Sequence, residues 1–102
     1  MADSLKVLKA GTMTTANATL YTVTASGTLL LSFASIANKA TADATCFLTI
    51  GTINIIPGKT IESKDAIFPP VKGAIISAGN TISGYANTAS AIDYYICGDE
   101  FV

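Results

Sequence analysis

The chain has 102 residues and a formal net charge of −1; half of its residues are hydrophobic and only 13% are charged. This length suits a single domain spanning residues 1–102. The sequence contains no His, Arg, Trp or Gln, so it lacks the commonest general base and zinc ligand. It also lacks the basic stripe that binds a phosphate backbone, which argues against direct nucleic-acid binding.

The low charge predicts an oligomer. A soluble single-domain surface usually carries roughly 25–35% charged residues, so part of this surface is expected to be buried against other subunits. The alternative is a mild surface of Ala and Thr, 16 and 14 residues respectively, that needs no partner. We expect a homo-oligomer.

The N-terminal sequence MADSLKVLKAGT shows no targeting signal, because Asp3, Lys6 and Lys9 interrupt its apolar positions. No apolar run approaches the ~20 residues of a membrane helix. We therefore expect synthesis in a cytoplasm and no membrane partner. Residues 1–12 favour an extended N-terminal arm over a helical turn.

Alternating runs rich in Ile, Thr, Val and Tyr, separated by Gly, Asn and Pro, follow this segment. They predict an all-β sandwich of about eight strands with jelly-roll or related Greek-key topology. The first two runs are 19–24 and 27–38. In the second run one face is expected to hold Leu29, Leu31 and Phe33 and the other Leu30, Ala34 and Ile36, which predicts a central strand covered on both sides.

Residues 44–51 alternate Cys46, Leu48 and Ile50 against Thr45, Phe47 and Thr49, which places Cys46 in the core. Gly51-Thr52 predicts a hairpin turn into 53–56. Pro57-Gly58 is expected to close that hairpin with a second turn. The two cysteines, Cys46 and Cys97, are predicted to be free thiols.

A short strand is expected around Ile61, followed by a charged turn at 63–65 and a strand through Ile67 and Phe68. Because Pro69-Pro70 cannot donate to a ladder, that strand should lie at an edge or end there. Residues 73–87 predict a strand, a turn at 78–80 and another strand. Gly84 in the latter indicates a bulge or a close backbone approach.

The last strand lies in SGYANTASAIDYYICGDE, residues 83–100. Alternation directs Ile92, Tyr94 and Ile96 to the core and Ala91, Asp93, Tyr95 and Cys97 outward. Side chains two positions apart on a strand are about 7 Å apart, too far for direct hydrogen bonds. With no His to activate a nucleophile and no G-x-S-x-G motif, we predict no catalytic residues.

No metal or cofactor site is predicted. The acidic residues Asp43, Asp65, Asp93, Asp99 and Glu100 suit calcium chemically, but only the last two are adjacent, and adjacent side chains on a strand diverge. The glycines are too widely spaced for a phosphate-binding loop.

An outward Tyr beside a carboxylate is a common interface composition. The predicted interface residues lie at both ends of the chain and on the last strand: Leu5, Val7, Asp93, Tyr95, Asp99, Glu100, Phe101 and Val102.

The segments TLYTV, ASIAN, FLTIG, IIPGKTI and ISAGNTISGYANTASAIDYYICGDE follow one another between about residues 10 and 100. This arrangement resembles the small all-β structural proteins of tailed bacteriophages, among them capsid cement and decoration proteins. The chain departs from the pattern at Asn80, where Asp would be expected, and at Cys97, where a small residue would be usual.

The resemblance implies a non-enzymatic virion protein at the capsid surface. Such a protein is typically a homo-oligomer, often a trimer, that sits over joints between major capsid proteins and stabilises the shell. An N-terminal arm could extend along a neighbour by strand addition.

Two alternatives stay open. One is a small tail, baseplate or fibre-associated virion protein. The other is a carbohydrate-binding β-sandwich with Tyr21, Tyr85 or Tyr95 as a stacking platform, which the absence of Trp makes less favoured.

Overall fold

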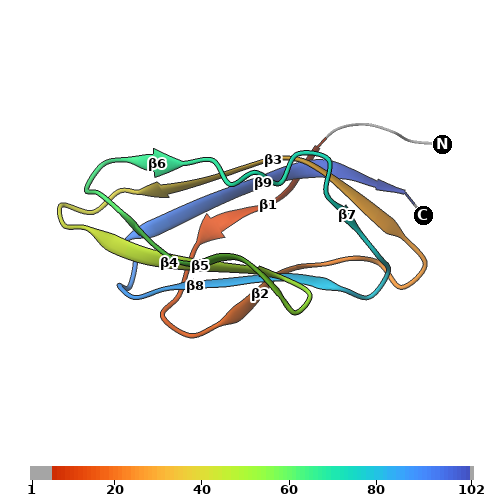
Figure 1. Cartoon of the computed structure of the whole chain (residues 1–102), viewed down its shortest axis with the longest axis horizontal. Coiled ribbons are helices and arrows are strands. Elements are labelled where there is room, and N and C mark those ends of the chain that lie inside the picture. The colour runs from red at the N-terminus through yellow and green to blue at the C-terminus, as the bar shows by residue number, and fades with distance from the viewer. Residues whose placement is uncertain (1–5, 102) are drawn as a thin grey trace.

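The computed structural model describes residues 6–101, which form nine β-strands and no helix. Two antiparallel sheets pack face to face, so the predicted all-β sandwich is confirmed (Figure 1). The strands are β1 (Lys6–Thr12), β2 (Ala18–Thr22), β3 (Thr28–Asn38), β4 (Ala44–Ile50), β5 (Ile53–Ile61), β6 (Ala66–Ile67), β7 (Ile75–Ile76), β8 (Thr81–Ala86) and β9 (Ile92–Phe101).

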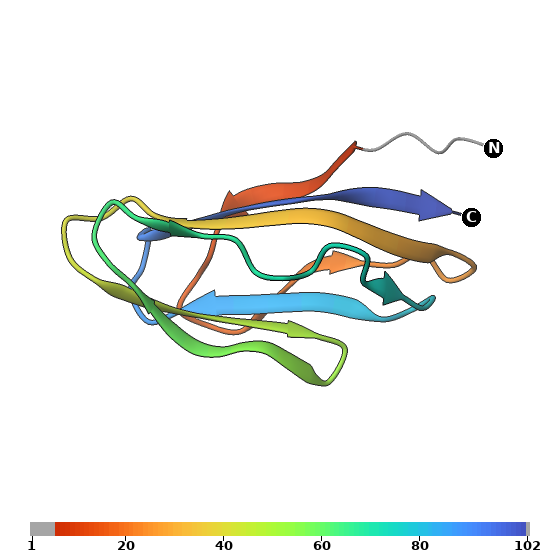
Figure 2. The same cartoon turned by 45° about the horizontal axis from the view of Figure 1, so that its top comes forward.

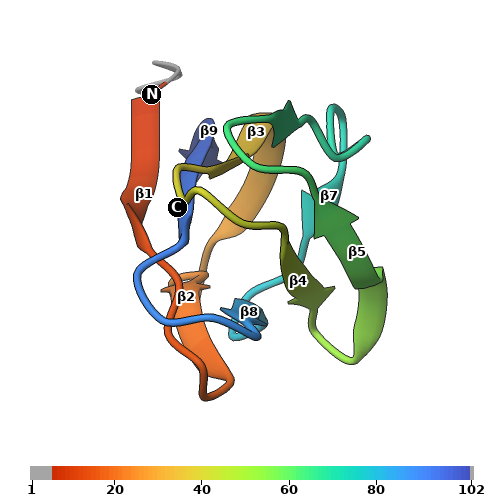
Figure 3. The ribbon, with the colours of Figure 1, turned by 90° about the vertical axis from the view of Figure 1, so that its left-hand side faces the viewer.

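One sheet has the order β1-β9-β3-β6, with β7 also paired to β3, and the other has the order β2-β8-β4-β5. Figure 2 shows the connection from β6 to β7 running along the front of the sandwich, above β5. In the end-on view of Figure 3, β1 and β2 lie on one side of the sandwich and β5 and β7 on the other. The two sheets are therefore open to each other along two opposite sides.

The core lies between the sheets, and the alternation predicted for the last strand is confirmed. Ile92, Tyr94 and Ile96 are at most 7% exposed, whereas Tyr95 is 43% exposed. Each fully buried Ile contributes about 1.5–3 kcal/mol by leaving water. The prediction that Ala91 faces outward is wrong. Ala91 precedes β9 and is buried, because the chain has not yet entered the alternating strand.

The prediction that Phe33 shares a face with Leu29 and Leu31 is also wrong, because Phe33 lies 41% exposed on the outer face of β3. The pairing of β3 with β9 shifts between Leu31 and Phe33, so Ser32 is an extra residue in β3. A β-bulge of this kind reverses the alternation after it. Consequently Leu29 and Leu31 are buried before the bulge, and Ala34 and Ile36 are buried after it. The strand is central, but its outer face is only partly covered.

Pro57 and Gly58 do not close the hairpin. They lie within β5, where the pairing with β4 shifts between Cys46 and Leu48. Because β5 is at the edge of its sheet, a Pro without an N–H is tolerated at this bulge. The predicted Gly51-Thr52 turn is present, with Gly51 at φ +61°.

The prediction of an extended N-terminal arm is wrong for residues 6–12. These residues form β1 and pair with β9 of the same chain, from Lys6↔Gly98 to Thr12↔Asp93. The pairing satisfies backbone groups along β9 that would otherwise lack partners. The rest of the expected arm, residues 1–5, lies outside the described residues.

Gly98 offers a test of the β3–β9 contact. A Cβ at this position would lie 2.5 Å from the backbone oxygen of Leu30, so any side chain would push the two strands apart. Gly98→Ala is expected to lower the free energy of unfolding by about 1–3 kcal/mol or more, measured by urea denaturation. Gly79→Asn is the control, because a Cβ at Gly79 meets nothing within 4 Å at φ +81° and Asn tolerates positive φ. Equal stability of both variants would contradict this account.

The cysteines allow a second test. Both are free thiols, as predicted; Cys46 is fully buried and Cys97 is half-buried on the outer face. Burial raises the pKa of the Cys46 thiol to about 11, so its thiolate is scarce at neutral pH. We expect a thiol reagent to modify Cys97 in the native protein and Cys46 only on unfolding, as read by mass spectrometry of the labelled peptides. Faster native labelling of Cys46 would show that the core opens.

Candidate interaction surfaces

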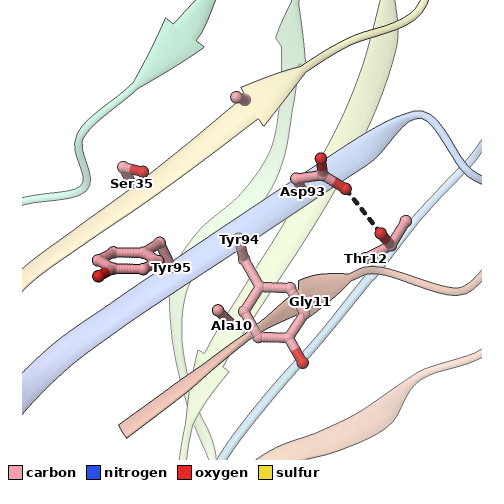
Figure 4. A pocket seen from close by; sticks show the side chains of 8 residues that line it. Ala10, Gly11, Thr12, Ser35, Asp93, Tyr94 and Tyr95 are labelled. Atoms are coloured by element: carbon pink, nitrogen blue, oxygen red, sulfur yellow. Dashed lines mark hydrogen bonds between the residues drawn. The ribbon is translucent and has the colours of Figure 1, made fainter. Parts of the chain in front are cut away.

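The predicted residues Asp93 and Tyr95 lie side by side on the outer face of β9, with Thr12 approaching from β1 (Figure 4). They border a shallow groove of about 450 Å³, termed the outer groove. Its lining comes from β1, β3 and β9: Ala10, Gly11, Thr12, Ser35, Ala37, Asp93, Tyr94 and Tyr95.

Asp93 is the charged centre of the outer groove. Its Oδ1 accepts a 2.6 Å hydrogen bond from the Thr12 hydroxyl and lies 3.0 Å from the Lys39 Nζ. Thr12 and Lys39 lower the pKa of the Asp93 carboxyl below its ordinary value. A carboxylate with a lowered pKa is a weak base at neutral pH. The Asp93 carboxyl is therefore ionised at neutral pH.

The other predicted interface residues do not form one surface. Val7 is 45% exposed on β1 opposite Cys97, so it shares the outer face with Asp93 and Tyr95. Phe101 is half-buried and pairs with Thr28. Leu5 and Val102 lie outside the described residues.

Asp99 and Glu100 diverge, as expected of neighbours on a strand. Glu100 points between the sheets: one carboxylate oxygen accepts a hydrogen bond from the Tyr21 hydroxyl and the other accepts a 2.7 Å bond from the Thr24 N–H. Glu100 thus ties β9 to β2 within the chain. Asp99 has a buried Oδ1 without a hydrogen-bond partner among residues 6–101.

The most apolar surface was missed by the sequence analysis. It consists of Phe33 on the outer face of β3 and three large side chains of β5 and the β6–β7 segment, and it is termed the apolar edge. Their exposed fractions are 41%, 65%, 65% and 71% for Phe33, Ile53, Phe68 and Ile75 respectively.

Two grooves and one ring contact join the members of the apolar edge. The rings of Phe33 and Phe68 have centroids 5.9 Å apart. Phe68 lines a groove of about 320 Å³ together with Ile55 of β5. Ile53, two residues earlier on β5, lines a neighbouring groove of about 250 Å³ with Ile75 of β7. The apolar edge is therefore continuous along this side.

Part of the apolar edge had a signal in the sequence. Phe68 directly precedes Pro69-Pro70, which indicates the end of an edge strand with little cover. Phe33 could not be recognised without the bulge at Ser32. The contact of Ile53 with Ile75 depends on which strands lie at the edges, a property of the whole topology.

The three tyrosines considered as alternative stacking platforms lie on different parts of the molecule. The Tyr21 hydroxyl bonds Glu100 between the sheets, and Tyr95 lies on the outer face of the β1-β9-β3 sheet. Tyr85 lies in the other sheet, where its ring stacks on Phe47 with centroids 4.4 Å apart.

Within residues 6–101 no group of three or more acidic or thiol side chains could hold a metal ion. The same residues include no helix that could cross a membrane. No protein-family model, curated protein or solved structure matches the chain.

The tie between Tyr21 and Glu100 predicts a pH dependence. Burial and the contact with Glu100 raise the pKa of Tyr21 to about 12 from an ordinary value of 10.0. Because the folded state holds this proton more tightly, the contribution to stability is complete below pH 10.0 and is lost as the pH rises toward about 12.

Tyr21→Phe should be less stable than the native chain by about 1–3 kcal/mol at neutral pH. The difference should narrow as the pH rises from 10.0 to about 12, measured by chemical denaturation at each pH. A constant difference would contradict the coupling of this proton to folding.

Proposed function

We propose that this chain is a non-enzymatic structural protein of a tailed-bacteriophage virion, which cements or decorates the capsid as a homotrimer. The apolar edge is the observation that carries the proposal. The resemblance of the C-terminal segments to phage cement and decoration proteins supplies the class of assembly.

The size of the apolar edge supports burial against a second copy. Its four side chains leave apolar surface on the order of 400 Å² in water, given the areas of such side chains. A standard interface buries about 800 Å² per partner, so the apolar edge could supply its hydrophobic centre. In a ring of three copies, this surface would meet a different surface of the next copy.

The strand edges favour docking through side chains rather than by strand addition. On β5, Pro57 and the adjacent bulge interrupt the free edge, and β6 and β7 have two residues each. The edges β1 and β2 each contain a register shift. Bulges, Pro and short strands are the usual protections against added strands.

The outer face of the β1-β9-β3 sheet is assigned to the capsid. It carries Val7 and Tyr95 beside the outer groove, and exposed Tyr contributes contact area while keeping a polar hydroxyl. Glu100 points away from this face, whereas Phe33 of the apolar edge lies on it, on β3 opposite Cys97. The surface for the neighbouring copy and the surface for the shell therefore adjoin at β3.

The strand order also supports the proposal. If β6 and β7 are counted as two parts of one interrupted strand, the two sheets have the orders 1-8-3-6 and 2-7-4-5. From these orders we infer a jelly roll, an architecture used by viral capsid domains.

The apolar edge gives the first test. Phe68→Asp should convert a trimer into monomers, because the charge would be buried without a partner, and sedimentation velocity would report the change. The variant should stay folded, since the chain exposes 5466 Å², close to the roughly 5,400 Å² of a compact monomer of this mass. Tyr95→Ala should leave the trimer intact and weaken binding to capsid shells that lack this protein.

A native chain that sediments as a monomer at micromolar concentrations and does not bind such shells would overturn the proposal. If the Phe68→Asp variant is still a trimer, the apolar edge is not the trimer interface, but the proposal of a trimer stands.

A further inference from the structure

The outer face of the β2-β8-β4-β5 sheet carries neutral polar side chains, unlike the outer groove and the apolar edge. The register places Thr19 of β2 beside Ser83 of β8, Ser83 beside Thr49 of β4, and Thr49 beside Asn54 of β5. One row of small polar side chains thus crosses all four strands. We propose that this surface, termed the hydroxyl face, binds a neutral glycan.

A second polar row runs parallel to the first. Thr45 of β4 pairs with Thr60 of β5, and their hydroxyl oxygens are 3.1 Å apart. Asn87 continues the row beyond β8, where its side-chain oxygen accepts a 2.8 Å hydrogen bond from the Thr45 N–H. Hydroxyl and amide groups both donate and accept hydrogen bonds, as the hydroxyls of a sugar require.

An aromatic pair separates the two rows. Tyr85 and Phe47 are cross-strand neighbours whose rings are stacked at 4.4 Å with an interplanar angle of 8°. Phe47 lies directly over Gly58, since a Cβ there would be 2.9 Å from the ring. Phe47 is therefore held between Gly58 and Tyr85, while the second face of Tyr85 takes part in neither contact. Such a ring can pack against the C–H face of a sugar.

The hydroxyl face carries no charge. Lys59 is the only charged residue in β2, β4, β5 and β8, and it lines the groove beside Phe68 on the apolar edge. A phosphate-bearing or sulfated polymer requires cationic side chains, and a basic segment requires carboxylates. These strands hold no carboxylate, and their single lysine, Lys59, lies at the apolar edge, so the matching ligand is uncharged.

A protein partner is the less suitable occupant. Protein interfaces are depleted in Ser, and Ser and Thr are under-represented among the residues that dominate binding energy. The apolar edge already has the composition of a protein interface. The hydroxyl face instead combines rows of neutral hydrogen-bonding groups with one aromatic ring, which matches a sugar chain.

The test is a two-dimensional NMR titration of the full chain with maltohexaose, cellohexaose and chitohexaose, each to about 10 mM. Heparin and oligogalacturonate serve as charged probes. We expect at least one neutral oligosaccharide to shift the amide resonances of Thr49, Ser83 and Tyr85, and neither charged probe to do so.

Variants locate the site. Thr49→Lys places charge and bulk in the central row and should weaken binding at least about tenfold, as should Tyr85→Ala. Ser35→Lys is the matched control on the outer groove and should leave binding unchanged. Thr49→Lys keeps the Tyr85–Phe47 stack, so it remains informative if Tyr85→Ala does not fold.

No shift with any of the three neutral oligosaccharides would overturn the inference. Shifts that map to the outer groove, or binding that survives Thr49→Lys, would do so as well. Because the titration needs neither a trimer nor capsid shells, its outcome is independent of the proposed structural role.

Discussion

The antiparallel pairing of β3 with β9 is the constraint on which the rest of the structure depends. It runs from Thr28↔Phe101 to Asn38↔Ile92 and places both strands at the centre of their sheet. The bulge at Ser32 lies within this pairing and determines that Leu31 is inward and Phe33 outward. The same register presents Asp93 and Tyr95 on the outer face and directs Glu100 toward Tyr21. One pairing thus sets the core, one external surface and a tie between the sheets.

The two sheets divide the surface into regions of different chemistry. The outer groove has a paired carboxylate, the apolar edge has aliphatic and aromatic side chains, and the hydroxyl face is neutral and polar. This separation follows from the period of two along strands, because each outward side chain is placed by the register of its neighbours. The apolar edge differs in origin, since it joins Phe33 on the outer face of β3 to side chains of β5 and the β6–β7 segment. Distinct partners could therefore occupy the three regions at the same time.

Local pattern was sufficient to predict the fold class, the free thiols and the inward set Ile92, Tyr94 and Ile96. It failed at Phe33 and at Pro57-Gly58, because each lies at or beside a bulge that only the partner strand defines. Asp93 and Tyr95 were correctly expected to lie outward together. Glu100 was expected at an interface, but its partner Tyr21 is 79 positions away, and no local pattern reveals such a contact. Phe33, Ile53 and Ile75 of the apolar edge were missed for the same reason, whereas Phe68 had a local signal in Pro69-Pro70.

The place of β9 has a consequence for synthesis. This strand lies between β1 and β3, yet it is made after both. During translation β1 has no strand to pair with, and the core lacks Ile92, Tyr94 and Ile96, until nearly all of the described chain has left the ribosome. Contacts between distant segments form slowly, so the sandwich should fold only after β9 has been made. A chain cut short before β9 would have no stable fold, which makes this strand a check on the integrity of the segment that precedes it.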